Sequence, residues 1–399
     1  MKIGVPKETA PGELRVALTP KEAGRLAASG LEVLVEAGAG HDSFPDAAYR
    51  EAKAQIAKGP KEPFGAEVVL KVRKPSEPEV ALLRSGGALI GFLQPLTSHE
   101  LVEKLAARGV LSFSLDAIPR ITRAQSMDAL SSQATIAGYK AVLIAAGSLG
   151  KIFPMLMTAA GTLKPARVFV LGAGVAGLQA IATARRLGGQ VEAFDVRAAA
   201  REEVHSLGAR FVELPLETQE GAGGYAREQS EEYLKKQREL LADHCAQSDV
   251  VITTALIPGR PAPVLITKEM VARMQSGSVI VDIAAEAGGN CELTEPGKVV
   301  NVQGVAIHGV LNPAAMVPIH ASELYAKNIT NLLALLVKDG ALQPDFEDDV
   351  VKGCCITHDG KVVHEPTLKS MESGAVAGGR PGGRAAPGRA ESKRPAGCA

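Results

Sequence analysis

The sequence predicts an α/β fold of two Rossmann-like domains, each a doubly wound parallel sheet, with a cleft between them. Short β-branched runs alternate with helical patterns, which is typical of parallel strands joined by crossover helices. The alternation occurs twice, on either side of a long helical pattern at 126–146. A chain of 399 residues is also long enough to bury two separate cores.

The first series of strands and helices precedes residue 119. Helical patterns occupy 19–30 and 98–109, and Gly30 stands where a helix C-cap belongs. The runs that predict strands are MKIGVP (1–6), LEVLVEAG (31–38), AEVVLKV (66–72), GALIGFL (87–93) and LSFSLDAI (111–118). A polar segment, PRITRAQSMD (119–128), here called the junction loop, then leads into the long helical pattern, which we interpret as the passage to the second domain.

The second series begins at residue 166. Its predicted strands are ARVFVL (166–171), VEAFDV (191–196), ARFVEL (209–214), SDVVITTA (248–255) and GSVIVDIAA (277–285). Residues 217–230 form a Gly-rich polar segment in a crossover of unusual length, so we predict a mobile flap there, followed by a helix. The stretch 320–340 predicts an amphipathic helix that returns the chain to the first domain, with one apolar face made of Leu324, Ile329, Leu332, Leu333 and Leu336.

These patterns give the domain boundaries. The first domain comprises residues 1–125 plus 306–371, and the second comprises residues 126–305. Residues 372–399 are rich in Gly, Ala, Arg and Pro and cannot bury enough apolar surface to offset their ordering entropy, so we predict a disordered tail.

Composition and charge argue against several classes of function. Acidic and basic residues balance at 44 each, which indicates neither a nucleic-acid nor a membrane-surface partner. No apolar run approaches the roughly 18–20 residues of a bilayer span, and the N-terminus lacks a signal-peptide core, so we expect a cytoplasmic protein without direct membrane insertion. The segment from Cys354 to His364 contains two cysteines and two histidines, but adjacent cysteines rarely chelate one ion and HDGK favours a hairpin turn; we predict no metal.

The strongest local motif is VFVLGAGVAGLQAIATARRLGGQVEAFDVR, in which Gly172, Gly174 and Gly177 form GxGxxG. A strand precedes the glycines, a helix follows, and Asp195 closes the next strand, which is the context of a dinucleotide site. The glycines permit a tight turn, close approach of a pyrophosphate, and close packing of helix on strand. Asp195 would accept hydrogen bonds from ribose hydroxyls, which favours NAD(H) over NADP(H), although Arg197 lies nearby.

If a dinucleotide lies along the second sheet, its nicotinamide end points toward the junction loop. A capped helix start, with Ser126 as N-cap and Asp128 in the first turn, would explain two of the loop's polar residues. It would not explain Arg120 or Gln125, which could hydrogen-bond a carboxamide and a ribose. The two interpretations are compatible.

Six segments together resemble one family: GVPKETAPGELRVALTP, RITRAQSMDALSSQ, LGAGVAGLQAIATARRLG, GAGGYAREQSEEYLKKQ, TTALIPGRPAPVLIT and VDIAAEAGGNCE. The family is that of the NAD(H)-binding α1 subunits (domain I) of proton-translocating NAD(P) transhydrogenase, which is related to alanine dehydrogenase. The resemblance extends from residue 1 to about 370, and RAQSMD is its most specific part.

The resemblance implies direct hydride transfer between NAD(H) on this chain and NADP(H) on a partner subunit, coupled to proton translocation by a membrane-spanning subunit. It also implies a homodimer, held peripherally at the inner (plasma) membrane by these partners. The residues that match the family's catalytic loop are Arg120, Gln125, Asp128 and Ser131. Further implied cofactor contacts are Ile121, Thr122, Val175, Asp195, Val196, Arg197, Gly224, Tyr225 (a lid), Gln237 and Leu256.

Two alternatives remain at this point. An alanine dehydrogenase would share GVPKETAPGELRVALTP, with Arg15 for a substrate carboxylate, but that family's lysine, histidine and aspartate are replaced here by Arg73, Gln94 and Glu286. A ketoacid reductase without a proton donor would be severely impaired. The other alternative, a non-catalytic NAD-binding module, would bind the nucleotide without exchanging hydride.

Overall fold

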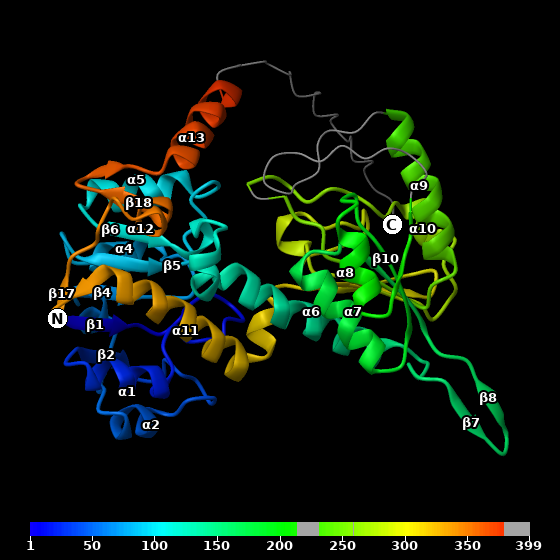
Figure 1. Cartoon of the computed structure of the whole chain (residues 1–399), viewed down its shortest axis with the longest axis horizontal. Helices are drawn as coiled ribbons and strands as arrows, with labels where there is room; N and C mark the ends of the chain where they lie inside the picture. Colours follow the sequence, from blue (N-terminus) through cyan, green and yellow to red (C-terminus); the bar gives the residue numbers. More distant parts are fainter. Residues whose placement is uncertain (214–230, 258, 379–399) are drawn as a thin grey trace, which may run out of the picture.

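The computed structural model describes residues 1–213, 231–257 and 259–378, which form two mainly parallel sheets flanked by helices (Figure 1). Two long helices, α6 (Ala129–Ser148) and α11 (Pro318–Leu336), pack on each other where the two halves of the molecule meet (Figure 1). The predicted fold class is confirmed.

The first sheet contains the N-terminal strands and a C-terminal hairpin. Its strands are β1 (Lys2–Val5), β2 (Glu32–Glu36), β3 (Gln55–Ala57), β4 (Val68–Leu70), β5 (Ala88–Gly91), β6 (Leu111–Ser114), β18 (Cys355–His358) and β19 (Lys361–Val362). They lie in the order β19-β18-β6-β5-β4-β1-β2-β3, and β1 to β6 are parallel. The helices are α1 (Pro20–Ala28), α2 (Asp46–Glu51), α3 (Lys61–Phe64), α4 (Glu77–Leu82), α5 (His99–Ala107), α12 (Asp349–Cys354) and α13 (Glu365–Gly378).

The second sheet is built in the same way. Its strands are β9 (Arg167–Leu171), β10 (Gln190–Phe194), β11 (Arg210–Phe211), β12 (Val250–Thr253), β13 (Val279–Asp282), β14 (Val299–Val302) and β15 (Val305–Gly309), in the order β11-β10-β9-β12-β13-β15-β14. Among the strands in the described part of this sheet, β14 alone is antiparallel to its neighbour. The helices are α7 (Val175–Arg186), α8 (Ala200–Ser206), α9 (Glu231–Ala246) and α10 (Lys268–Ala272).

Both sheets reverse their strand order at one point, between β1 and β4 in the first and between β9 and β12 in the second. In doubly wound sheets the crevice beyond the carboxyl ends of the strands at such a point is where ligands bind. The topology therefore marks the loops after β1, β4, β9 and β12 as the places to look for a site.

Short elements complete the fold. They are the two-stranded ladders β7 (Leu156–Thr158) with β8 (Gly161–Leu163) and β16 (Val337–Lys338) with β17 (Ala341–Leu342), and the 3₁₀ helices η1 (Leu115–Ala117), η2 (Thr122–Met127), η4 (Ala285–Ala287) and η5 (Pro313–Met316). The β7–β8 hairpin projects from the second half of the molecule (Figure 1). The hairpin predicted at HDGK is confirmed, since Asp359 and Gly360 have φ of 48° and 74° between β18 and β19.

Three boundaries differ from the sequence prediction. The long helix begins at Ala129 rather than Ser126, because the preceding turn is a 3₁₀ helix. The strand Val305–Gly309 pairs with β13 in the second sheet, so the chain returns to the first domain later than residue 306. The helix α13 continues to Gly378, so residues 372–378 of the predicted tail are helical. The predicted flap, 217–230, and residues 379–399 lie outside the described residues.

The predicted return helix is present as α11. Ile329, Leu332, Leu333 and Leu336 are buried in the core of the first sheet, while Leu324 is only half buried. Among the helices in the described part of the chain, none combines the length and apolar character needed to cross a membrane.

Candidate functional site

A cavity of about 850 Å³ opens at the switch point of the second sheet, a volume within the roughly 300–1,000 Å³ range of small-molecule sites. Residues from the carboxyl ends of β9, β10 and β12 line it, together with the junction loop and the start of α6. The lining comprises Pro119, Arg120, Ile121, Thr122, Ala124, Gln125, Asp128, Ser131, Gly172, Gly174, Val175, Phe194, Asp195, Val196, Arg197, Gln237, Arg238, Leu241, Thr254, Ala255, Leu256, Ile257, Arg260, Pro263, Val264 and Leu265.

The glycine turn between β9 and α7 has the predicted geometry. Gly172 has φ of 95°, a left-handed conformation that side chains rarely adopt. A Cβ at Gly177 would lie 1.8 Å from the Gly172 carbonyl oxygen, so only glycine lets the helix pack this closely. At Gly174, the N-cap of α7, a Cβ would meet nothing within 4 Å, because this position faces the open cavity. The α7 N-terminus therefore presents its backbone to the cavity, an arrangement that favours anions.

Asp195 ties the end of β10 to the glycine turn. One carboxylate oxygen accepts the Ala173 amide at 2.7 Å, and the other accepts the Arg197 amide at 2.8 Å. The Arg197 guanidinium also pairs with the carboxylate, Nε to Oδ1 at 3.0 Å. The predicted ribose acceptor is thus held in place by groups that already use part of its hydrogen-bonding capacity.

The junction loop enters the cavity from the first domain. Its 3₁₀ helix η2 is followed by Asp128, whose carboxylate accepts the Ser131 amide at 2.9 Å and the Ser131 hydroxyl at 2.6 Å. Asp128 is therefore the N-cap of α6, and the predicted N-cap at Ser126 was wrong. The cap fixes the start of α6 directly beside Gln125.

The cavity gathers most of the predicted site residues. Every described member of the predicted set lines it except Gly177, which packs α7 on β9 instead. Gly224 and Tyr225 lie outside the described residues. Sequence reasoning missed Arg238 and Arg260, two cations on the cavity wall, and Thr254, whose hydroxyl donates to the Gly172 carbonyl oxygen at 3.1 Å. The position of Thr254 directly after a buried strand was the available signal.

A second polar cluster occupies the switch point of the first sheet. The buried Arg15 pairs with Glu13, Nη2 to Oε2 at 2.7 Å and Nε to Oε1 at 2.8 Å, and it also donates to Gln133 at 2.9 Å. Burial acts to raise the pKa of Glu13, but hydrogen bonds and charge from Arg15 outweigh it, and the pKa lies below its ordinary value. Arg15 is thus neutralised and bonded within the protein.

An ion pair joins a loop that follows a strand of the first sheet to a loop that follows a strand of the second sheet. Arg73, beyond β4, meets Glu286 in η4, Nη2 to Oε1 at 3.0 Å. Its Nε also lies 3.3 Å from Glu13 Oε2. Burial acts to lower the pKa of Arg73, but the hydrogen bond and charge of Glu286 dominate and raise it. Two residues that differ from the alanine dehydrogenase pattern therefore neutralise each other across the molecule.

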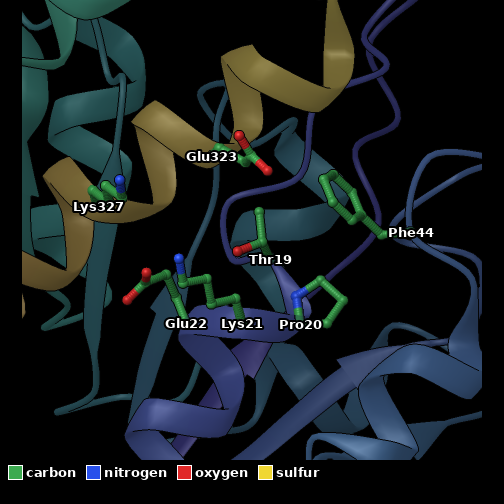
Figure 2. Close-up of a pocket in the computed structure, with 7 residues that line it drawn as sticks. All are labelled: Thr19, Pro20, Lys21, Glu22, Phe44, Glu323 and Lys327. Carbon is green, nitrogen blue, oxygen red and sulfur yellow. The ribbon is translucent and has the colours of Figure 1, made fainter.

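Two other candidate sites, a metal site and a smaller cavity, have weaker support. Within the described residues no group of three or more His, Cys, Asp or Glu side chains could hold a metal ion. Burial raises the pKa of Cys355 to about 12, which disfavours the thiolate that a metal needs. A smaller cavity of about 280 Å³ between α1 and α11 mixes two lysines with two glutamates (Figure 2) and contains none of the predicted site residues.

Known proteins resemble most of the chain. The family description "Alanine dehydrogenase/PNT, N-terminal domain" matches residues 4–137, and "Alanine dehydrogenase/PNT, C-terminal domain" matches residues 141–365. An NAD(P) transhydrogenase subunit alpha chain of Rhodospirillum rubrum is 50% identical over 376 residues, covering 91% of this chain and 98% of its own. Alanine dehydrogenase of Bacillus subtilis is 30% identical over 381 residues, covering 93% and 95%. A transhydrogenase structure from Sinorhizobium meliloti has a TM-score of 0.83 at 48% identity, covering 91% of this chain and 100% of that chain.

Proposed function

Because the chain belongs to the alanine dehydrogenase/PNT family, and within it to the NAD(P) transhydrogenase alpha subunits, we propose that it is the NAD(H)-binding subunit of a proton-translocating transhydrogenase. Hydride passes directly between NAD(H) on this chain and NADP(H) on a partner subunit, and a membrane-spanning subunit couples the transfer to proton translocation. The observation that carries the proposal is that the junction loop and the glycine turn line one cavity.

The cavity suits a reaction without a protein acid or base. Hydride transfer between two nicotinamides exchanges no proton with the enzyme, and bound NAD(H) supplies the hydride chemistry. The protein has to orient the cofactor and exclude water. Among the described lining residues there is no histidine, and both aspartates are engaged, Asp128 as a helix cap and Asp195 with Arg197.

The cavity residues take the following roles in this proposal. Gly172 and Gly174, with the N-terminus of α7, receive the pyrophosphate, and Gly177 keeps that helix close. Val175, Asp195, Val196 and Arg197 hold the adenosine end. Arg120, Ile121, Thr122 and Gln125 contact the nicotinamide end, Asp128 and Ser131 support the loop, and Gln237 and Leu256 complete the enclosure. Gly224 and Tyr225, which lie outside the described residues, are further cofactor contacts that the family resemblance implies.

Amino-acid dehydrogenation is the less favoured function. A ketoacid substrate needs a free cation for its carboxylate and a proton donor, but Arg15 already donates to Glu13, Gln133 and Asn312. Arg73 and Glu286 are paired with each other. Identity of 50% to a transhydrogenase subunit against 30% to an alanine dehydrogenase supports the same choice.

The assembly follows from the same proposal. We place the protein in the cytoplasm as a homodimer, associated with the inner (plasma) membrane through its partner subunits. The β7–β8 hairpin supports self-association, because apolar side chains stand exposed on and beside it: Met155 at 59%, Met157 at 72% and Leu163 at 53%. Exposed apolar groups that cluster on a projecting element are typical of protein interfaces.

The decisive experiment measures hydride exchange between NADH and an oxidised NAD analogue. The purified chain is assayed alone, then with an NADP(H)-binding transhydrogenase subunit and NADPH, beside a reaction with pyruvate and ammonia. Exchange only in the presence of the partner is expected. Turnover of pyruvate by the chain alone would contradict the proposal in favour of an amino-acid dehydrogenase. Nucleotide binding without hydride exchange, even with the partner present, would instead indicate a non-catalytic NAD-binding module.

A further inference from the structure

The side chains of the 3₁₀ helix η2, which lies within the junction loop, form three faces. A 3₁₀ helix has three residues per turn, so side chains at i and i+3 share one face. Thr122 and Gln125 line the cavity. Ala124 and Met127 are buried in the hydrophobic core of the first domain, and Ala124 also borders the cavity. Arg123 and Ser126 make up the third face, and the cavity lining contains neither of them.

The third face is bonded to the C-terminal part of the first domain. Arg123 makes a two-pronged ion pair with Asp348, Nη1 to Oδ2 at 2.6 Å and Nη2 to Oδ1 at 2.9 Å. Asp348 is also the N-cap of α12, because Oδ1 accepts the Val350 amide at 2.8 Å. Gly353 in α12 lets Pro119, the first residue of the loop, pack close: a Cβ there would lie 3.3 Å from the proline ring.

Two asparagines of α11 hold the backbone of the loop near the other end of η2. The Asn328 and Asn331 side-chain amides both donate to the Ser126 carbonyl oxygen, at 2.9 Å and 3.0 Å. Asn328 also accepts the Ser132 hydroxyl at 2.7 Å, which ties α11 to the first turn of α6. The loop is therefore fastened on both sides of Gln125.

We propose that Arg123 and Asp348, assisted by Asn328 and Asn331, are positioning residues that fix the rotation of η2 and so direct Thr122 and Gln125 into the cavity. A shift of one residue along a three-residue turn would replace the cavity face with another face. Burial of Ala124 and Met127 restrains this rotation on one face, and the Arg123–Asp348 pair restrains it on another. The inference rests on the proposed function, in which the cavity holds the nicotinamide end of NAD(H) beside this loop.

The test compares dissociation constants for NADH and for ADP, which lacks the nicotinamide end. The variants are Arg123→Ala, Arg123→Lys, Asp348→Asn and the double variant Arg123→Ala/Asp348→Asn; asparagine keeps the α12 cap but removes the charge. We expect Arg123→Ala and Asp348→Asn each to weaken NADH binding about fivefold, as for a well-formed exposed ion pair. The double variant should bind NADH no more weakly than either single variant, because both changes break the same ion pair. Arg123→Lys should recover part of the lost NADH affinity. The affinity for ADP should not change in any of these variants.

Lys151→Ala is the matched control. Lys151 pairs with Asp249 at 2.6 Å, the two side chains are 60% and 13% exposed, and Asp249 also accepts a backbone amide, as Asp348 does. Arg123 and Asp348 are 50% and 21% exposed. Unchanged NADH affinity in Arg123→Ala and Asp348→Asn, or equal losses for NADH and ADP, would overturn the inference. Failure of the unmodified chain to bind NADH would instead contradict the proposed function.

Discussion

At the scale of single residues, the site depends on carboxylates that already have partners. Asp195 accepts the Ala173 amide from the glycine turn and the guanidinium of Arg197. Asp128 caps α6, and Asp348 caps α12 while pairing with Arg123. A carboxylate held by fixed donors has one orientation, so its remaining lone pairs point in a defined direction. These residues shape the cavity before a nucleotide enters it.

Replacing Asp195 by alanine should reduce the preference for NAD(H). The substitution removes a ribose acceptor and the negative charge beside Arg197, so a 2′-phosphate would no longer meet a carboxylate there. We expect NADH binding to weaken about tenfold, as for loss of a charge-assisted hydrogen bond, while NADPH binding strengthens. Fluorescence titrations with the two nucleotides measure the ratio. Equal weakening of both would show that Asp195 supports the turn without selecting the cofactor.

The pKa of Asp348 should depend on Arg123. The hydrogen bond from Arg123 lowers the pKa of Asp348 from its ordinary value of 3.8 to about 2. Because the folded-state pKa is lowered, the ion pair contributes stability above pH 4 that is lost as pH falls toward 2. Carboxyl NMR titration should show the pKa of Asp348 rising toward 3.8 in Arg123→Ala. A value that stayed near 2 would assign the shift to the α12 amides alone.

At the scale of elements, the crossing of α6 and α7 connects the junction loop to the helix that follows the glycine turn. A Cβ at Gly138 would lie 2.0 Å from the carbonyl oxygen of Ala176 in α7. α6 carries the Asp128 cap at one end, and α7 carries the Gly174 turn. The close crossing therefore sets the distance between the two walls of the cavity.

Gly138→Ala should destabilise the protein by about 1–3 kcal/mol, because overpacking at a helix contact forces the backbones apart. Gly147 is the control on the same helix, since a Cβ there meets nothing within 4 Å. Gly147→Ala should stabilise by about 0.5–1 kcal/mol through helix propensity. Denaturant unfolding measures both. Similar free energies of unfolding for the two variants would mean that the crossing tolerates a wider spacing.

At the scale of the whole molecule, the carboxyl ends of the two sheets are linked through charged side chains. Arg73 follows β4 in the first sheet, and Glu286 follows β13 in the second. Arg15 reaches Asn312, which follows β15, at 3.1 Å. These contacts connect the two domains and restrain the position of one sheet relative to the other.

Arg73→Ala should widen the distribution of distances between the two domains. The free energy of unfolding should change by no more than about 1 kcal/mol, because Glu286 is 42% exposed and the buried Glu13, the other partner of Arg73, keeps its pair with Arg15. Spin labels on α2 and α8 report the inter-domain distance by pulsed electron resonance. Arg273→Ala, which breaks the Arg273–Asp243 pair within the second domain, is the control. Equal distributions of inter-domain distance in the two variants would mean that α6 and α11 fix the domain arrangement without help from Arg73.

The sequence determined the fold class and the nucleotide turn, because hydrophobic periodicity and the spacing of Gly172, Gly174 and Gly177 are local properties. It also predicted most of the described cavity lining, largely through resemblance to a family. Only the tertiary structure decided that Asp128 rather than Ser126 caps α6, that β15 stays in the second sheet, and that Arg123 faces Asp348. These depend on packing between segments far apart in the chain, and the ion pair joins residues 225 positions apart, which no local pattern encodes.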